Sequence, residues 1–177
     1  MDQAYKYWRQ DDPRFNQSEA WPASLFPTAE YRHFRDCGCL VCALAVMLRH
    51  YGIEEEANED LFNPWVLNQK LIDCGAFSPG ADLELLYINR LYPLTYLGEE
   101  PYSQETLVRF AKSGLPCLVT IPGNNADAHF TTLLQVLPDD AVVYDPLCGE
   151  KKLSSYDRIC EIRPFRKSFV HGRSATC

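Results

Sequence analysis

A cysteine that opens an apolar run is the first candidate for nucleophilic chemistry in this chain. Cys39 directly follows Gly38. At the start of a helix, unpaired backbone N–H groups and the positive end of the dipole favour a thiolate. The same N–H groups can face an oxyanion that forms on a substrate carbonyl. A buried, unreactive thiol is the alternative, and it carries more weight for any cysteine considered alone. Cys42, one turn later, fits that unreactive class.

A histidine and an aspartate stand at the ends of two expected strands. His129 begins one strand, and Asp145 ends the next, just before Pro146. A turn at Pro138-Asp139-Asp140 would join the two strands as a hairpin, so the start of one lies beside the end of the other. A carboxylate there would hold the imidazole in the correct tautomer and stabilise its charged form. A surface histidine and an unrelated turn aspartate fit the spacing equally well.

The chain has eight cysteines, and three of them lie close together in the sequence. Cys37, Cys39 and Cys42 fall within six residues, a spacing that could hold a metal ion. Structural zinc sites usually combine two such pairs separated by a loop, and no second pair exists here. We therefore expect no metal and no cofactor. Metal binding by the cysteines is kept as a weaker hypothesis, which elemental analysis of the purified protein would test.

The elements that must position these residues begin with helices. Apolar residues at helical spacing predict a helix over about 39–51, apolar on nearly every side and ended by Gly52. A second helix is expected from Asn63-Pro64 to Gly75, because proline suits the first turn of a helix. A third is expected from Asp82, and a fourth over 104–112, capped by Ser103.

Short β-branched and apolar runs follow the helices. Strands are expected at 116–121, 129–137, 141–144 and 158–163. Helices followed by antiparallel strands predict an α+β fold with one segregated half of each kind. We expect a single domain over 1–177, with an aromatic N-terminal arm at 1–35 that wraps the domain and a frayed tail at 167–177.

Composition and charge exclude several classes of partner. The formal net charge is −7, which argues against nucleic acid as the main partner. The longest apolar run, 40–48, is too short to span a bilayer, so no membrane association is expected. The N-terminus shows no signal peptide, which predicts a protein made in the cytoplasm.

Several short motifs, in order along the chain, resemble the bacteriocin-processing, double-glycine peptidase-like family of papain-like cysteine peptidases, including bacterial and phage members. The run from Cys39 to Gly52 resembles the nucleophile helix of that family, with Leu44-Ala45 in register. The other matching segments are Gln10-Asp11-Asp12-Pro13-Arg14-Phe15, Asn63-Pro64 with Leu67-Asn68 and Leu71, Gly75-Ala76-Phe77, Ser113-Gly114-Leu115-Pro116, His129-Phe130 and Asp145-Pro146. The resemblance covers about residues 8–165.

The resemblance implies a papain-like fold, in which the nucleophile helix packs on a C-terminal antiparallel sheet. It implies Cys39 as nucleophile, His129 as base and Asp145 as the orienting acid. Cys37 is the competing nucleophile, but counting from Cys37 puts the family's Leu-Ala pair and closing glycine two residues out of register. The resemblance also makes Gln10 a candidate donor to the oxyanion, with a solvated arm residue as the alternative.

The function implied is a cysteine hydrolase that cleaves an amide bond in a peptide or protein, with a cell-wall peptide as one plausible substrate. Deamidation and acyl transfer use the same groups. A second hypothesis, from a different class, is a non-catalytic component of a larger assembly such as a phage particle or a secreted complex. On either hypothesis the protein, once made, could be virion-associated or exported by another route.

Overall fold

The computed structural model describes residues 8–22, 25, 33–123 and 128–168, which form helices packed on an antiparallel sheet. The helical elements are α1 (Phe34–Cys37), α2 (Cys39–His50), α3 (Pro64–Asp73), the 3-10 helix η1 (Leu85–Arg90), α4 (Gln104–Lys112) and the 3-10 helix η2 (Leu153–Ser155). The strands are β1 (Leu94–Tyr96), β2 (Glu100–Pro101), β3 (Cys117–Pro122), β4 (Ala128–Val136), β5 (Ala141–Asp145), β6 (Gly149–Lys152) and β7 (Glu161–Lys167).

Within the described residues these strands form one seven-stranded sheet, in the order β1-β7-β3-β4-β5-β6 with β2 also paired to β7. Every pairing is antiparallel. β4 and β5 are the hairpin expected from the sequence, and their turn is closed by Leu137 N donating to Asp140 O at 2.8 Å. The structure therefore combines helices with an antiparallel sheet, as the sequence predicts.

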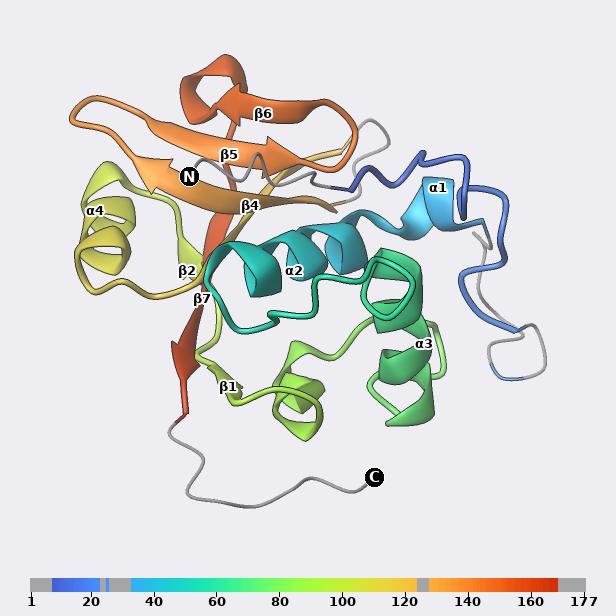
Figure 1. The fold of residues 1–177 in the computed structure, drawn as a ribbon. Helices are drawn as coiled ribbons and strands as arrows, with labels where there is room; N and C mark the ends of the chain where they lie inside the picture. The colour runs from blue at the N-terminus through green and yellow to red at the C-terminus, as the bar shows by residue number, and fades with distance from the viewer. Residues whose placement is uncertain (1–7, 23–24, 26–32, 124–127, 169–177) are drawn as a thin grey trace.

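Helix α2 is buried between the sheet and the N-terminal segments. Its residues from Val41 to Leu48 are all buried, which explains why the sequence is apolar on nearly every side. Thr132 of β4 donates its hydroxyl proton to the Ala43 carbonyl at 2.5 Å, an additional tie between helix and sheet. Figure 1 shows α2 running beneath β4 and β5.

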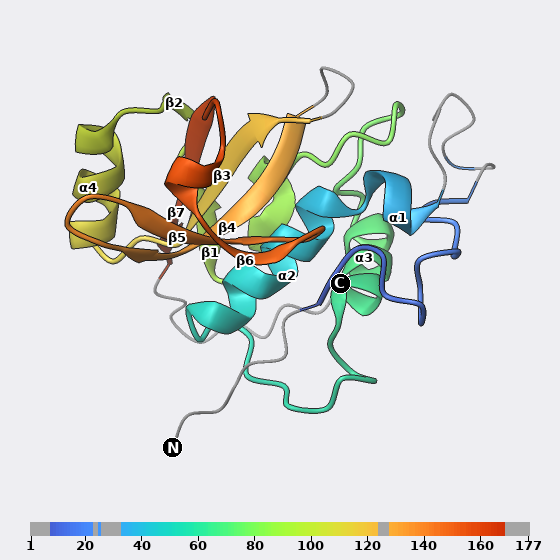
Figure 2. The ribbon, with the colours of Figure 1, turned by 90° about the horizontal axis from the view of Figure 1, so that it is seen from above.

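The other face of the sheet is covered by α4. Side chains of β3 alternate between the two faces: Leu118 packs in the cluster around α2, whereas Val119 and Ile121 pack in the cluster around α4. Seen from above, α4 and α2 lie on opposite sides of the strands (Figure 2). The sheet is thus the middle layer of three. The start of β4 and the end of β5 lie next to the start of α2.

Aromatic side chains attach the described part of the N-terminal arm to the helices. Trp8 meets Phe62 edge to face, with ring centroids 5.6 Å apart, and Phe15 meets Phe34 in the same way at 5.2 Å. Asn68 of α3 donates an amide proton to the Ala20 carbonyl. The expected tail at 167–177 falls mostly outside the described residues, which end at 168.

Three expected helices are confirmed, with Pro64 in the first turn of α3 and Ser103 as the N-cap of α4, as predicted, whereas the C-cap of α2 is Tyr51, one residue before the expected Gly52. The Asn63 side chain accepts from Val66 N at 2.9 Å at the start of α3, and Ser103 accepts from Thr106 N at 3.0 Å at the start of α4. The α-helix expected from Asp82 is wrong. This segment first makes a turn closed by the Phe77–Leu83 bridge and then forms only η1.

The strand predictions are confirmed in part. β3, β4 and β5 match the expected ranges within two residues, whereas β7 begins three residues later than expected and extends to Lys167. β1, β2 and β6 had no counterpart in the prediction. They are two to four residues long, and pairing with β7 and β5 creates them, so local composition carries little signal for them. In the part of the chain that the structure describes, no helix combines the length and apolar character that a membrane crossing requires.

Gly38 allows α1 and α2 to follow one another closely. A Cβ built on Gly38 would lie 2.5 Å from the Phe34 ring and 2.5 Å from the Phe34 carbonyl oxygen. Phe34 is completely buried, so its ring has little room to move away. Only glycine fits directly before Cys39 without displacing the core.

We predict that Gly38→Ala lowers the free energy of unfolding by about 1–3 kcal/mol, because the new methyl group overpacks the Phe34 site. Urea unfolding measures this change. Gly80→Ala is the matched control, since its Cβ would meet its nearest neighbour at 3.4 Å and should change stability by less than about 0.5 kcal/mol. Equal effects of the two substitutions would contradict the packing role of Gly38.

Candidate active site

Cys39 is the first residue of α2 and is partly exposed. The N-cap residue is Gly38, which has no side chain to cap the helix. The N-terminal N–H groups and the positive end of the dipole therefore lie at the thiol without a capping side chain between them. In Figure 1 the start of α2 lies on the same side of the molecule as the start of β4 and the end of β5.

The sheet register brings His129 and Asp145 together. Thr132 of β4 pairs with Tyr144 of β5. Extending this register by one residue sets Asp145 opposite Thr131. His129, two residues before Thr131, then lies on the same face as Asp145 and diagonal to it. The His129 Nε2 to Asp145 Oδ1 distance is 2.9 Å. The sequence expectation that these two side chains meet is thus what the structure shows.

The Asp145 carboxylate is buried and accepts three hydrogen bonds. Its side chain is 4% exposed, against 12% for His129. Besides bonding to His129, Oδ1 accepts from the Leu147 backbone N–H at 2.8 Å. Oδ2 accepts from the Tyr156 hydroxyl at 2.7 Å. The ionised carboxylate is therefore satisfied at both oxygens, which compensates for its removal from water.

These contacts stabilise opposite charges on the two side chains. Burial alone would raise the pKa of Asp145, but hydrogen bonds from His129, Tyr156 and Leu147 outweigh it and lower that pKa to about 2. Burial alone would lower the pKa of His129, but its interactions with Asp145 and Cys39 outweigh it and raise that pKa to about 9. His129 is therefore an imidazolium at neutral pH.

The His129 ring connects the aspartate to the cysteine. Because Nε2 is hydrogen-bonded to Asp145, Nδ1 is the nitrogen left to face Cys39, which lies close enough to raise the pKa of His129. Cysteine, imidazole and carboxylate thus lie next to one another in that order, an arrangement able to move a proton between sulfur and nitrogen. The catalytic roles assigned to the three residues stay predictions.

Gln10 is buried between the two segments that carry Asp145 and Cys39. Only 4% of the residue is exposed, so it is not a solvated arm residue. Its backbone N–H donates to Pro146 O at 3.0 Å, and its side-chain Nε2 donates to Arg35 O at 2.5 Å. One Nε2 proton is thereby occupied, and the second is the one that could serve an oxyanion. This role of Gln10 stays a prediction.

The neighbouring cysteines lie in different surroundings. Burial raises the pKa of the Cys37 thiol to about 12, with smaller contributions from Cys39 and Asp36. The Cys37 thiol donates to His33 O at 3.2 Å. Cys42 is completely buried, which raises its pKa well above the ordinary value, as expected for an unreactive thiol. In the described ranges, no three His, Cys, Asp or Glu side chains are grouped so as to hold a metal ion.

Two partners of Asp145 were not anticipated from the sequence. The Leu147 N–H bond follows from the turn after Pro146, and an aspartate two residues before the donor is a common turn arrangement that could have indicated it. Tyr156 is eleven residues from Asp145 and reaches it only because η2 folds back over β5. No local pattern indicates that contact.

Comparison with known proteins gives a limited result. No protein-family model matches the chain, and no curated protein matches it. Among solved structures, the chain is similar to one described as the crystal structure of a double glycine motif protease from AMS/PCAT transporter in complex with the leader peptide. The similarity has 26% sequence identity and a TM-score of 0.42, and covers 71% of this chain and 84% of the other. Backbones that agree to this degree superpose only in part.

The ion pair predicts a defined pH dependence of stability. The stabilisation from Asp145 is present above its ordinary pKa of 3.8 and is lost as pH falls through about 2. The stabilisation from His129 is present below 6.5 and is lost as pH rises through about 9. We predict that Asp145→Asn lowers the free energy of unfolding by about 3 kcal/mol between roughly pH 4 and 6.5. Urea unfolding of both proteins across pH measures the difference.

The loss of unfolding free energy in Asp145→Asn should become smaller below roughly pH 4 and above roughly pH 6.5. His129→Gln, which removes the same pair from the other side, is the control. The double variant should lose little more than either single variant, because both act on one interaction. A difference that stays constant from pH 3 to pH 10 would show that the pair does not stabilise the fold.

Proposed function

We propose that this protein is a cysteine hydrolase that cleaves an amide bond in a peptide or protein, using Cys39, His129 and Asp145. The observation that carries the proposal is the position of the His129 ring, which is hydrogen-bonded to Asp145 and has Cys39 beside it. Nucleophile, base and orienting acid are the three parts that this kind of catalysis requires. The motif resemblance to papain-like peptidases agrees with the assignment.

The proposed reaction has two stages. The proton of the Cys39 thiol is held on His129 Nδ1 as the imidazolium, and the thiolate sulfur attacks the substrate carbonyl carbon. The carbon–nitrogen bond then breaks as the imidazolium returns the proton to the leaving amine, which leaves a thioacyl group on Cys39. In the second stage His129 takes a proton from water, the hydroxide displaces the sulfur, and a carboxylic acid is released. Asp145 keeps the imidazole oriented throughout.

Backbone and side-chain N–H groups would stabilise the oxyanion that precedes each bond cleavage. The first turn of α2 supplies N–H groups directly at Cys39, and no side chain of Gly38 competes for them. Gln10 would add its second Nε2 proton. Its two hydrogen bonds, to Pro146 O and Arg35 O, hold it between the loop after Asp145 and helix α1 before Cys39.

A peptide or protein is the substrate class that this machinery fits best. Deamidation and acyl transfer are related outcomes, in which ammonia leaves or an amine replaces water in the second stage. A non-catalytic component of a larger assembly remains the alternative of a different class, and its prediction is that Cys39 is dispensable. Cytoplasmic synthesis with later export or virion association also stays a prediction.

We predict that an electrophilic peptide probe labels Cys39 and that His129→Ala abolishes the labelling, because no base then activates the thiol. Mass spectrometry of the labelled protein measures both outcomes. Turnover of a peptide library should fall about 10⁴-fold or more in Cys39→Ala. Cys148→Ala removes an exposed cysteine and is the matched control that should keep activity.

Two results would contradict this proposal. One is labelling of Cys39 that is unchanged by His129→Ala, which would mean that the thiol is not activated by the imidazole. The other is full biological function in Cys39→Ala, which would favour the non-catalytic alternative. Release of ammonia or transfer to an added amine would instead identify the variant of the same chemistry.

We predict that Gln10→Ala lowers kcat by about 10²-fold with little change in KM, since an oxyanion donor acts only when charge develops. Steady-state kinetics on a cleaved peptide measures the split. Asn16→Ala is the matched control, because its side-chain amide donates to Asp11 O within the arm instead of to the segment before Cys39. Equal losses in both variants would assign Gln10 a purely structural role.

A further inference from the structure

Tyr156 contacts the proposed catalytic chain from outside it. Its hydroxyl donates to Asp145 Oδ2 at 2.7 Å. The other oxygen, Oδ1, is the one that bonds to His129 at 2.9 Å. The tyrosine thus holds the oxygen that the histidine does not use.

The position of Tyr156 is set by the short helix before it. Leu153, the first residue of η2, is buried in the cluster under α4 at 2% exposure. Ser154 is tied to Asp140 of the β4–β5 turn, donating from its backbone N at 3.0 Å and from its hydroxyl at 2.6 Å. Tyr156 N then donates to Leu153 O at 3.2 Å. The segment that carries Tyr156 is therefore fixed to the same hairpin that carries Asp145.

We propose that Tyr156 is a positioning residue, which holds the Asp145 carboxylate in the rotation that directs Oδ1 at His129. This inference rests on the proposed function, in that it treats His129 as the acid–base group. Tyr156 itself touches neither the substrate nor the reacting atoms.

The argument for positioning comes from how a carboxylate rotates. The terminal torsion of an aspartate is broad, so a carboxylate held at one oxygen can swing away from its partner. A hydrogen bond from a hydroxyl to an ionised carboxylate is short and strong, and it fixes the second oxygen. Asp145 is held by the Leu147 N–H at Oδ1 and by Tyr156 at Oδ2, so its plane is defined at both ends.

Other charged and titratable groups near Tyr156 are few among the described residues. Lys151 of β6 places its Nζ 5.4 Å from the centre of the tyrosine ring, and the Cys148 thiol also acts on the hydroxyl electrostatically. Burial and the hydrogen bond to Asp145 together raise the pKa of Tyr156, so the phenol keeps its proton and remains a donor. The donor is therefore present throughout the pH range in which His129 titrates.

The test is Tyr156→Phe, which keeps the ring and removes only the hydroxyl. The pKa of His129 is measured by NMR on protein with labelled histidine, and His129→Gln assigns its signal among the four histidines of the chain. A carboxylate free to swing bonds the imidazolium less often, so the pKa of His129 should fall from about 9 towards its ordinary value. Alkylation of Cys39 by iodoacetamide at neutral pH should slow by about three- to tenfold.

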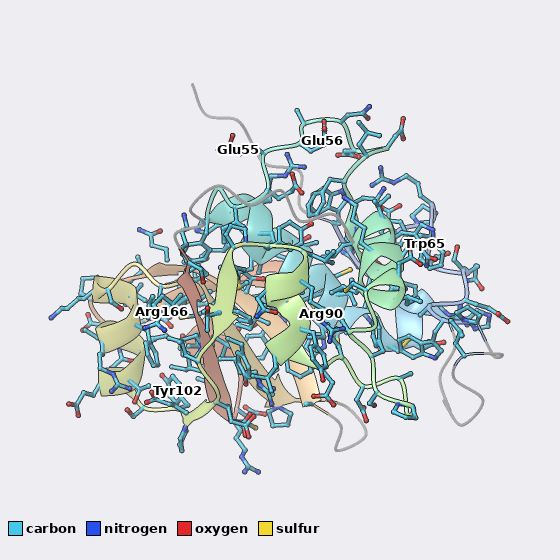
Figure 3. The ribbon with its side chains drawn as sticks, turned by 90° about the horizontal axis from the view of Figure 1, so that it is seen from below. Glu55, Glu56, Trp65, Arg90, Tyr102 and Arg166 are labelled. Atoms are coloured by element: carbon cyan, nitrogen blue, oxygen red, sulfur yellow. The ribbon has the colours of Figure 1, made fainter. Side chains whose placement is uncertain are left out.

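Tyr102→Phe is the matched control. Tyr102, labelled in Figure 3, packs against the same cluster as Tyr156. Its hydroxyl donates to Gln104 and not to Asp145. The control should leave the pKa of His129 and the alkylation rate unchanged. In an Asp145→Asn background, adding Tyr156→Phe should change neither quantity further, because the effect passes through the carboxylate.

Three results would overturn the inference. They are an unchanged pKa of His129 in Tyr156→Phe, an increase of that pKa, and equal effects of Tyr156→Phe and Tyr102→Phe. An increase would mean that the hydroxyl only withdraws charge from the carboxylate and does not orient it. The NMR measurement needs no substrate, so a failure to find hydrolysis would overturn the proposed function while leaving the role of Tyr156 supported by the shift.

Discussion

Helix α2 is buried on nearly every side, and this burial constrains the positions of the segments around it. The sheet covers one side and the N-terminal arm and α3 cover others, so every residue from Val41 to Leu48 is removed from water. A helix held in this way cannot shift along its axis without exposing apolar surface. Its first residue, Cys39, is therefore presented at one fixed place, where β4 begins and β5 ends. The close packing of Gly38 against Phe34 fixes the backbone that leads into Cys39.

The buried charge at Asp145 organises the proposed site around that fixed point. An ionised carboxylate that is 4% exposed is tolerated only because three hydrogen bonds replace its water. These bonds come from β4, from the turn after β5 and from the segment after η2. The same three hydrogen bonds that replace the water around the carboxylate also fix its orientation towards His129.

The N-terminal arm contributes more than a cover for the core. Gln10 joins the loop after Asp145 to the turn before Cys39 through one backbone and one side-chain hydrogen bond. Two segments that are more than a hundred residues apart in the chain are thus tied together by a residue from a third. A displacement of the arm would loosen the relation between the carboxylate and the cysteine, even though neither lies in the arm.

The sequence by itself determined the local features. Helical spacing, capping residues and a turn between two β-branched runs predicted α2, α3, α4 and the β4–β5 hairpin, because these features depend on residues close together in the chain. The hairpin register was enough to bring His129 to Asp145. Only the tertiary structure decided which residues complete the surroundings of that pair. Tyr156 reaches Asp145 because η2 folds back over β5, and Gln10 is buried because the arm returns to the end of β5. β1, β2 and β6 exist because a neighbouring strand offers hydrogen bonds. Such contacts join segments whose proximity is set by packing of the whole chain, and no local pattern of residues encodes that proximity.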